Sequence, residues 1–151
     1  MKPSVAILTG LMLRAAAFFQ SPASADRDAV FYFEGAGKPP ASIFGIYGLV
    51  RAGHDSIQVT EKSSSRIGVN LRLYFSSGHT CQLAQDGEWT GDHVAVIAEG
   101  LDADRPCRLD LFFENGRIRL EDEGLHCAPV YCGTRGKLDG ASLTKSSLNR
   151  K

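Results

Sequence analysis

Residues 67–75 read IGVNLRLYF, and this stretch decides the fold. Apolar side chains occupy every second position from its first residue to its last, and polar, small or amphipathic residues stand between them. Because successive side chains of a strand point to opposite faces, this alternation predicts a strand with one buried face. Ser76-Ser77-Gly78 then supplies a turn, so the next segment is expected to return antiparallel to this one.

The segments after this turn continue the pattern. Pairing Phe75 with His79 across the turn places Cys81 on the buried face of the sheet. A second turn at Gly91-Asp92 leads into residues 93–99, which are apolar on both faces. Such a segment is expected to lie centrally in its sheet.

Another hairpin signal is Asn115-Gly116, which tolerates the positive φ angles of a type I′ turn. The residues expected on the inner face around it are Cys107, Leu109, Leu111, Phe113, Ile118 and Leu120. Upstream, residues 46–51 and 56–61 predict a hairpin, and residues 29–34 predict a brief first strand. No window shows helical periodicity. The sequence therefore predicts an all-β fold, a small antiparallel meander or barrel of about seven strands stapled by disulfides.

The amino terminus predicts a secretory signal peptide over residues 1–25. An apolar run over residues 5–19 precedes Ala23-Ser24-Ala25, which is typical of a cleavage site. The run is short and Arg14 interrupts it, which disfavours an uncleaved membrane anchor. We expect a mature chain without a transmembrane segment, periplasmic or secreted, with a single β domain over residues 26–140 and a flexible basic tail over residues 141–151.

Charge is unevenly distributed in this mature chain. Without Lys2 and Arg14 it keeps 15 basic and 17 acidic residues, a net charge of −2 that argues against nucleic-acid binding. The stretch from residue 133 onward carries +4, and the body before it −6. The expected partner is an envelope protein or an anionic envelope component.

The four cysteines all lie in the exported part. They are Cys81, Cys107, Cys127 and Cys132, an even number in an oxidising compartment, which predicts two disulfides. Shared inward parity favours pairing Cys81 with Cys107, and proximity favours pairing Cys127 with Cys132, while the other two connectivities stay open.

Neither a metal, a cofactor nor a catalytic site is predicted. The histidines His54, His79, His93 and His126 lack the paired spacing of a zinc site and are expected on the surface. The acids Asp102, Asp104, Glu121, Asp122 and Glu123 are typical of solvated turns. No nucleophile motif is present. A non-enzymatic binding role is therefore favoured, and the alternatives are a polysaccharide hydrolase that uses a carboxylate pair and a structural envelope protein.

Three groups of residues are candidates for binding. The loop residues Ser77, Gly78, His79 and Thr80 are expected to be exposed and polar, suited to insertion into a partner's cleft. Trp89, the only tryptophan, is expected either to cap one end of the core or to anchor a partner at its rim. Arg135 and Lys137 supply positive charge near the carboxy terminus.

Two features resemble known families. The pattern Tyr131-Cys132-Gly133-Thr134-Arg135-Gly136, followed by Leu138-Asp139-Gly140, resembles a carboxy-terminal signature of small exported bacterial proteins of unassigned role, over about the last fifth of the chain. A signal peptide followed by a disulfide-stapled β domain of this size resembles the periplasmic lysozyme inhibitors, which plug a lysozyme's catalytic cleft with a loop. Their C-type members carry Ser-Gly-x-x-Tyr in that loop, whereas Ser77-Gly78-His79-Thr80 is followed here by Cys81. The resemblance implies an inhibitory binding protein.

Overall fold

The computed structural model describes residues 37–133 and 135–147, which belong to one compact unit of the chain, Phe33–Lys151. The expected signal peptide and the expected strand at residues 29–34 lie outside the described residues. Within the described part, no helix is long and apolar enough to cross a membrane.

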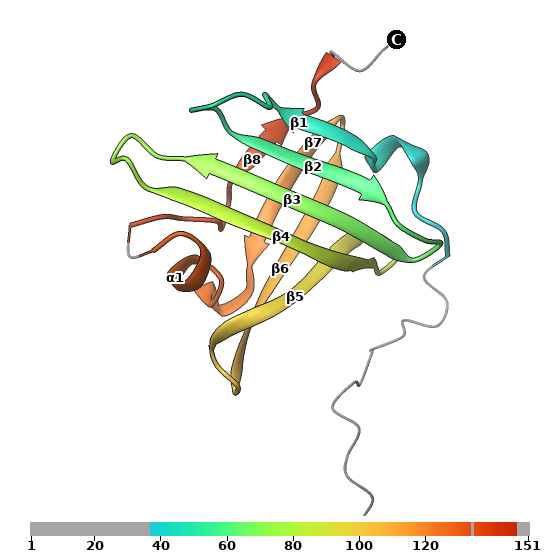
Figure 1. Cartoon of the computed structure of the whole chain (residues 1–151). Helices are drawn as coiled ribbons and strands as arrows, with labels where there is room; N and C mark the ends of the chain where they lie inside the picture. The colour runs from blue at the N-terminus through green and yellow to red at the C-terminus, as the bar shows by residue number, and fades with distance from the viewer. Residues whose placement is uncertain (1–36, 134, 148–151) are drawn as a thin grey trace, which may run out of the picture. The chain divides into compact units, whose positions relative to one another are not determined.

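Eight antiparallel strands form one sheet in which each strand pairs with its neighbours in sequence (Figure 1). The strands are β1 (Gly45–Gly48), β2 (Ser56–Glu61), β3 (Arg66–Tyr74), β4 (Thr80–Trp89), β5 (His93–Asp102), β6 (Arg105–Glu114), β7 (Arg117–Asp122) and β8 (Ser142–Thr144). The short helical segments η1 (Ala41–Ile43), η2 (Glu123–Leu125) and α1 (Ala128–Tyr131) complete the described chain. The predicted fold class, an antiparallel, disulfide-stapled β meander or barrel, is confirmed.

The register follows the alternation of the sequence. The Phe75 backbone N–H donates to the His79 carbonyl at 2.9 Å, and Cys81 lies opposite Leu73 as predicted. Both side chains are buried. Asn115 and Gly116 have φ angles of 50° and 74°, as a type I′ turn requires.

The sheet curls until it is nearly closed into a barrel. Tyr47 of β1 forms an antiparallel bridge with Lys145, and the Ser146 N–H donates to the Ile46 carbonyl at 2.7 Å. Closure removes the free edges that a flat sheet would leave. Apolar side chains from all eight strands fill the interior in one continuous cluster.

The flexible tail predicted from residue 141 is wrong for its described part. Ser142–Thr144 forms β8, which pairs with β7 and carries the buried side chain of Leu143 into the core. The sequence did not indicate this strand, because three residues in a Ser- and Lys-rich segment are too few to show alternation of apolar and polar side chains. The edge of β7, which needs a partner, orders this segment.

The prediction that residues 93–99 lie centrally in the sheet is confirmed, because β5 stands between β4 and β6 in the middle of the strand order. Val94 and Val96 are buried, but Ile97 is 55% exposed on the outside of the barrel. Ile97 faces outward because it alternates with the inward-facing Val94 and Val96. It also lies just beyond Val96, where the pairing of β5 with β4 ends. Figure 1 shows α1 on the side where β4 and β5 separate.

The favoured disulfide pairing is also wrong. Cys81 is bonded to Cys132 and Cys107 to Cys127, with Cα–Cα distances of 4.0 and 4.4 Å. Cys127 and Cys132 flank α1 and have helical backbone angles themselves. Five helical steps rise about 7.5 Å, too far for one bridge to join the two. Each end of α1 is instead bonded to a different strand, β4 at one end and β6 at the other.

Candidate functional site

The β3–β4 loop projects from the end of the barrel that carries α1 (Figure 1). Ser76, Ser77 and Gly78 are exposed, and His79 and Thr80 are half-buried at the base of the loop. The Gly78 N–H donates to the Phe75 carbonyl at 2.9 Å, which closes the turn. Gly78 has a φ of 81° and no neighbouring atom within 4 Å of its Cβ position. The tip of the loop is therefore polar and open to solvent as predicted, but the exposure predicted for His79 and Thr80 is only partial, because Thr80 already belongs to β4.

The Cys81–Cys132 disulfide holds the basic segment at the base of this loop. Cys81 directly follows Thr80, the last residue of the loop. A Cβ atom on Gly136 would lie 2.1 Å from the Cys132 Cβ, so the Gly136 backbone packs directly against Cys132. Arg135 and Lys137 flank Gly136, and both are exposed. The structure thus brings together two of the three predicted groups of binding residues.

Neither Arg135 nor Lys137 forms an ion pair with another described residue. Their positive charges are therefore not paired with acids of the described barrel. Of the acids in this region, Asp102 is held by Arg105, whose hydrogen bond lowers the pKa of the Asp102 carboxyl.

Exposed apolar side chains surround the loop end. Six large apolar residues of the described chain are exposed: Leu49, Val50, Ile97, Leu101, Leu125 and Val130. All but Ile97, which lies midway along β5, occupy the β1–β2 connection, the end of β5, η2 or α1. These segments and the β3–β4 loop share one end of an up-and-down meander. The loop end of the barrel therefore carries five of the six exposed large apolar side chains of the described chain.

The helix α1 is a rigid part of this surface. Besides its two disulfides, the Asp122 carboxylate accepts the N–H groups of Cys127 and Ala128 at 3.0 and 2.9 Å. The Tyr131 hydroxyl donates to the Glu99 carbonyl at 3.2 Å, and burial raises the pKa of that hydroxyl. Val130 is thus presented from a fixed platform.

Trp89 does not belong to this surface. It ends β4, whereas Thr80 begins the same strand, and the nine steps between them span about 30 Å. Its indole is only 6% exposed and packs in the core at the opposite end of the barrel. Two roles were predicted for Trp89, a cap on one end of the core and an anchor for a partner. The position of its side chain in the core agrees with the first role.

Most of the predicted candidate carboxylates form an ion pair or accept hydrogen bonds from backbone N–H groups, and one is exposed on its own. Glu121 pairs with Arg119, and Glu123 with Arg108 at 3.1 Å. Asp122 is buried and bound by backbone N–H groups, and Asp104 is exposed near the β5–β6 turn. Glu121, Asp122 and Glu123 do line one hollow of about 480 Å³ on the outside of the barrel, together with Asp110 and Asp139. The partners just named hold all three of these candidates, whereas a glycosidase needs an acid and a base that are free to reach its substrate.

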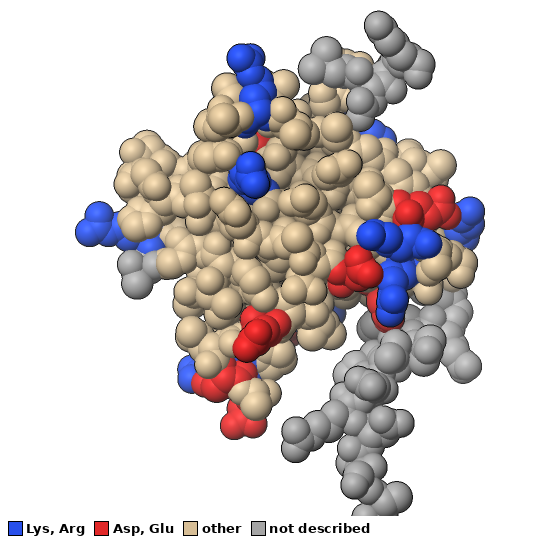
Figure 2. Space-filling view, in the orientation of Figure 1, with Lys and Arg blue, Asp and Glu red and all other residues tan. Residues whose placement is uncertain are grey.

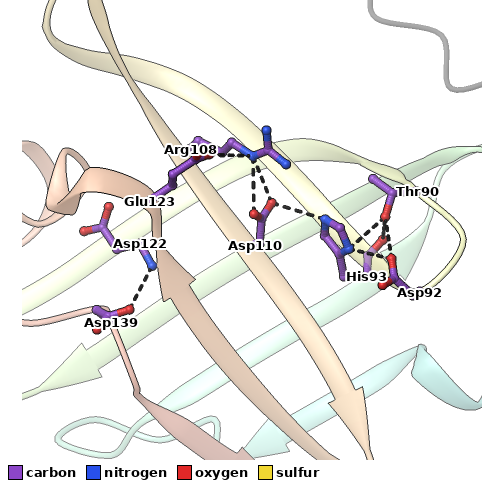
Figure 3. Close-up of polar contacts among 8 residues, drawn as sticks. All are labelled: Thr90, Asp92, His93, Arg108, Asp110, Asp122, Glu123 and Asp139. Atoms are coloured by element: carbon purple, nitrogen blue, oxygen red, sulfur yellow. Dashed lines mark hydrogen bonds and ion pairs between the residues drawn. The ribbon is translucent and has the colours of Figure 1, made fainter.

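A polar cluster on the outside of β5, β6 and β7 was not predicted (Figure 3). His93 Nδ1 lies 2.6 Å from Asp92 and 2.9 Å from the Thr90 hydroxyl, and His93 Nε2 lies 3.5 Å from Asp110. Asp110 also accepts from Arg108 at 3.3 Å. The Thr90 hydroxyl lies 3.1 Å from Asp92 Oδ1 and 3.0 Å from the His93 carbonyl, so its one proton has two acceptors within the turn. The alternation of side chains along β5 and β6 predicts that His93, Arg108 and Asp110 lie on the outer face. Only the pairing register of the two strands shows that these side chains are neighbours.

No metal site is found among the described residues. His93 lies in the polar cluster, and no group of three or more potential metal ligands occurs in the described part of the chain. The outer face of β2, β3 and β4 is largely uncharged, with charged side chains at its margins (Figure 2). A shallow hollow of about 580 Å³ there is lined by polar side chains such as Gln58, Thr60 and Asn70.

No protein-family model, no curated protein and no solved structure matches this chain. The resemblance to lysozyme inhibitors therefore stays a prediction.

Proposed function

We propose that the protein is an exported, non-enzymatic binding module of the cell envelope that inhibits a lysozyme-like hydrolase. The β3–β4 loop enters the hydrolase cleft, and the apolar rim around it packs on the surface outside. The single observation that carries this proposal is the narrow, exposed loop Ser76-Ser77-Gly78 at the end of a barrel whose interior is filled. A filled barrel leaves its loops as the parts able to engage a partner.

Charge complementarity supports a glycosidase as the partner. Glycosidases place two carboxyl groups across the scissile bond, which makes their clefts acidic. The loop brings no acid of its own over residues 76–80, and Arg135 and Lys137 are held at its base. Cations near the mouth of an acidic cleft speed association and fix the orientation of the complex.

An oxidising compartment fits the same proposal. Both disulfides are formed and no described cysteine is free. Such bridges persist in exported proteins and are rare in the cytosol. A hydrolase acting on the envelope works in that compartment.

The alternative function, a hydrolase with its own carboxylate pair, has weaker support. Glu121 and Glu123 are held by arginines and Asp122 by backbone N–H groups. A purely structural role would not require unpaired cations beside an exposed loop.

An inhibition assay with a C-type lysozyme tests the proposal. The mature protein is expected to slow the clearing of a bacterial cell-wall suspension. Ser77→Trp should abolish inhibition because an indole widens the loop tip, and the double variant R135E/K137E should weaken inhibition by about tenfold or more, with a steep dependence on salt.

The matched control is Lys62→Glu, which reverses one exposed charge at the opposite end of the barrel and should leave inhibition unchanged. All variants should keep the wild-type melting temperature because the four substituted positions are exposed. Inhibition that survives Ser77→Trp, or no inhibition by the wild-type protein, would rule out insertion of this loop into a lysozyme.

A further inference from the structure

A pocket of about 340 Å³ opens at the end of the barrel opposite the β3–β4 loop. Segments far apart in sequence build it: the chain before β1, the end of β4, the β6–β7 turn and the residue after β8. Its lining includes Ile43, Tyr47, Trp89, Phe113, Arg117 and Lys145. Mouths of β-barrels are frequent sites for small ligands, and this volume lies at the lower end of their usual range.

The inner walls of the pocket are aromatic and aliphatic. Tyr47 and Phe113 lie with ring centroids 5.9 Å apart, and Trp89 lines the same pocket. The Tyr47 hydroxyl is already used, since it donates to the Ile43 carbonyl at 2.9 Å. The walls therefore present apolar surface to a ligand and few free hydrogen-bonding groups.

The rim of the pocket carries two cations and one acid. Arg117 is exposed and forms no ion pair with another described residue. Lys145 donates to the Ser42 carbonyl at 2.6 Å, and its Nζ lies 5.8 Å from the centroid of the Tyr47 ring. The acid, Asp92, already accepts hydrogen bonds from His93 and Thr90, which lower the pKa of its carboxyl. Asp92 therefore stays ionised, and with Arg117 and Lys145 the charged side chains of the rim sum to a net charge of +1.

We propose that this pocket binds a small anionic amphiphile, a molecule with an apolar body and one carboxylate. The body lies against Trp89 and Phe113, and the carboxylate is held at the rim by Arg117 and Lys145. A guanidinium suits a carboxylate because it can donate two parallel hydrogen bonds. The pocket suits a medium-length alkyl chain better than a long lipid, given its volume. This site is separate from the loop surface, so it does not depend on the proposed inhibitory function.

Trp89 makes the test direct because it is the only tryptophan of the chain and lines the pocket. Decanoate, below its micelle concentration, is titrated into the mature protein while Trp89 emission is recorded. The expected result is a saturable change in emission. Decan-1-ol and decyltrimethylammonium, with the same chain and no negative charge, should bind at least about tenfold more weakly, as expected from the loss of one charged contact.

Variants then locate the site. Arg117→Gln should weaken decanoate binding by about fivefold to tenfold, a loss typical of one charge-assisted hydrogen bond. The matched control is Arg72→Gln, which removes one exposed charge on the outer face of β3 and should change nothing. Lys145→Gln should also weaken binding. Because Lys145 packs near Tyr47, Lys145→Arg serves as a second variant that keeps the charge and should keep binding.

The proposal is overturned if Trp89 emission does not respond to decanoate. Equal responses to decanoate and decan-1-ol would also overturn it, because the anionic head would then play no part. A third contrary result would be equal weakening by Arg117→Gln and Arg72→Gln, which would place the bound decanoate elsewhere.

Discussion

The carboxylate of Asp122 accepts the backbone N–H of Cys127 at 3.0 Å, and it lies at the junction between the last residue of β7 and the start of α1. It accepts the Ala128 N–H as well, and the Asp122 side chain is almost fully buried. The first N–H groups of a helix have no partner inside the helix, so a carboxylate there stabilises it. Together with the two disulfides, this side chain fixes the position of α1.

Replacing Asp122 by Ala should therefore destabilise the fold by about 2 to 3 kcal/mol, because one buried and one partly buried N–H group lose a charged acceptor. Asp122→Asn keeps one acceptor oxygen and should cost less. Urea denaturation measures both, with the exposed Asp104→Asn as the control. A loss for Asp122→Ala no larger than that of the control would contradict this role.

The disulfide pairing predicts a specific peptide map. Digestion without reduction should yield one peptide pair joining Cys81 to Cys132 and another joining Cys107 to Cys127. Any peptide joining Cys81 to Cys107 would refute the pairing. The loops closed by the bridges differ in length, with sequence separations of 51 and 20 residues. Loop entropy predicts that replacing the Cys81–Cys132 pair by serines costs about 4 kcal/mol and the other pair about 3.

The β6–β7 turn should tolerate asparagine but not valine at Gly116. Its φ of 74° strains a β-branched residue, while nothing lies within 4 Å of its Cβ position. Gly116→Val should thus destabilise by about 1 to 3 kcal/mol through backbone strain alone. Gly116→Asn should cost much less, because asparagine visits the left-handed region readily. Equal melting temperatures for the two variants would mean that the strain argument is wrong.

β8 should contribute to stability although it has only three residues. Leu143→Ala removes a buried side chain and is expected to cost about 2 to 3 kcal/mol, whereas Ser142→Ala, exposed on the same strand, should be nearly neutral. Deleting residues 142–151 should lower the melting temperature, because the deletion also exposes the edge of β7. An unchanged melting temperature after the deletion would show that β8 adds nothing to the fold.

Alkaline pH should unfold the protein partly through Tyr47. Burial raises the pKa of its hydroxyl from 10.0 to about 12. The folded state therefore holds this proton more tightly than the unfolded state does. The corresponding stability is complete below pH 10 and is lost as pH rises from 10 through 12, by up to about 2 to 3 kcal/mol.

Tyr47→Phe isolates this effect from the other groups that titrate in the same range. The variant loses the hydrogen bond to the Ile43 carbonyl and should be less stable at pH 8. Between pH 10 and 11 its stability should fall less steeply than that of the wild type, as measured by urea denaturation. Parallel slopes would contradict a raised pKa for Tyr47.

Much of the fold follows from local sequence. Alternating apolar residues from Ile67 to Phe75 and the turn at residues 76–78 specify a half-buried strand and its antiparallel partner, because side-chain period and turn length set the register. This is why Cys81 was correctly placed opposite Leu73, and Asn115-Gly116 in a hairpin turn. The exposed loop at Ser77 was predicted on the same local grounds.

Tertiary structure alone decided which distant segments meet. The four residues of α1 are too few to show helical periodicity, yet the helix separates Cys127 from Cys132 and sends each to a different strand. That pairing puts Arg135 beside the β3–β4 loop. Closure of the barrel likewise ordered β8 from a segment with no strand signal of its own. The alternation of side chains and the residues of a turn determine structure over a few neighbouring positions. The disulfide pairing and the position of β8 depend instead on which edges and surfaces the nearly closed sheet leaves unpaired.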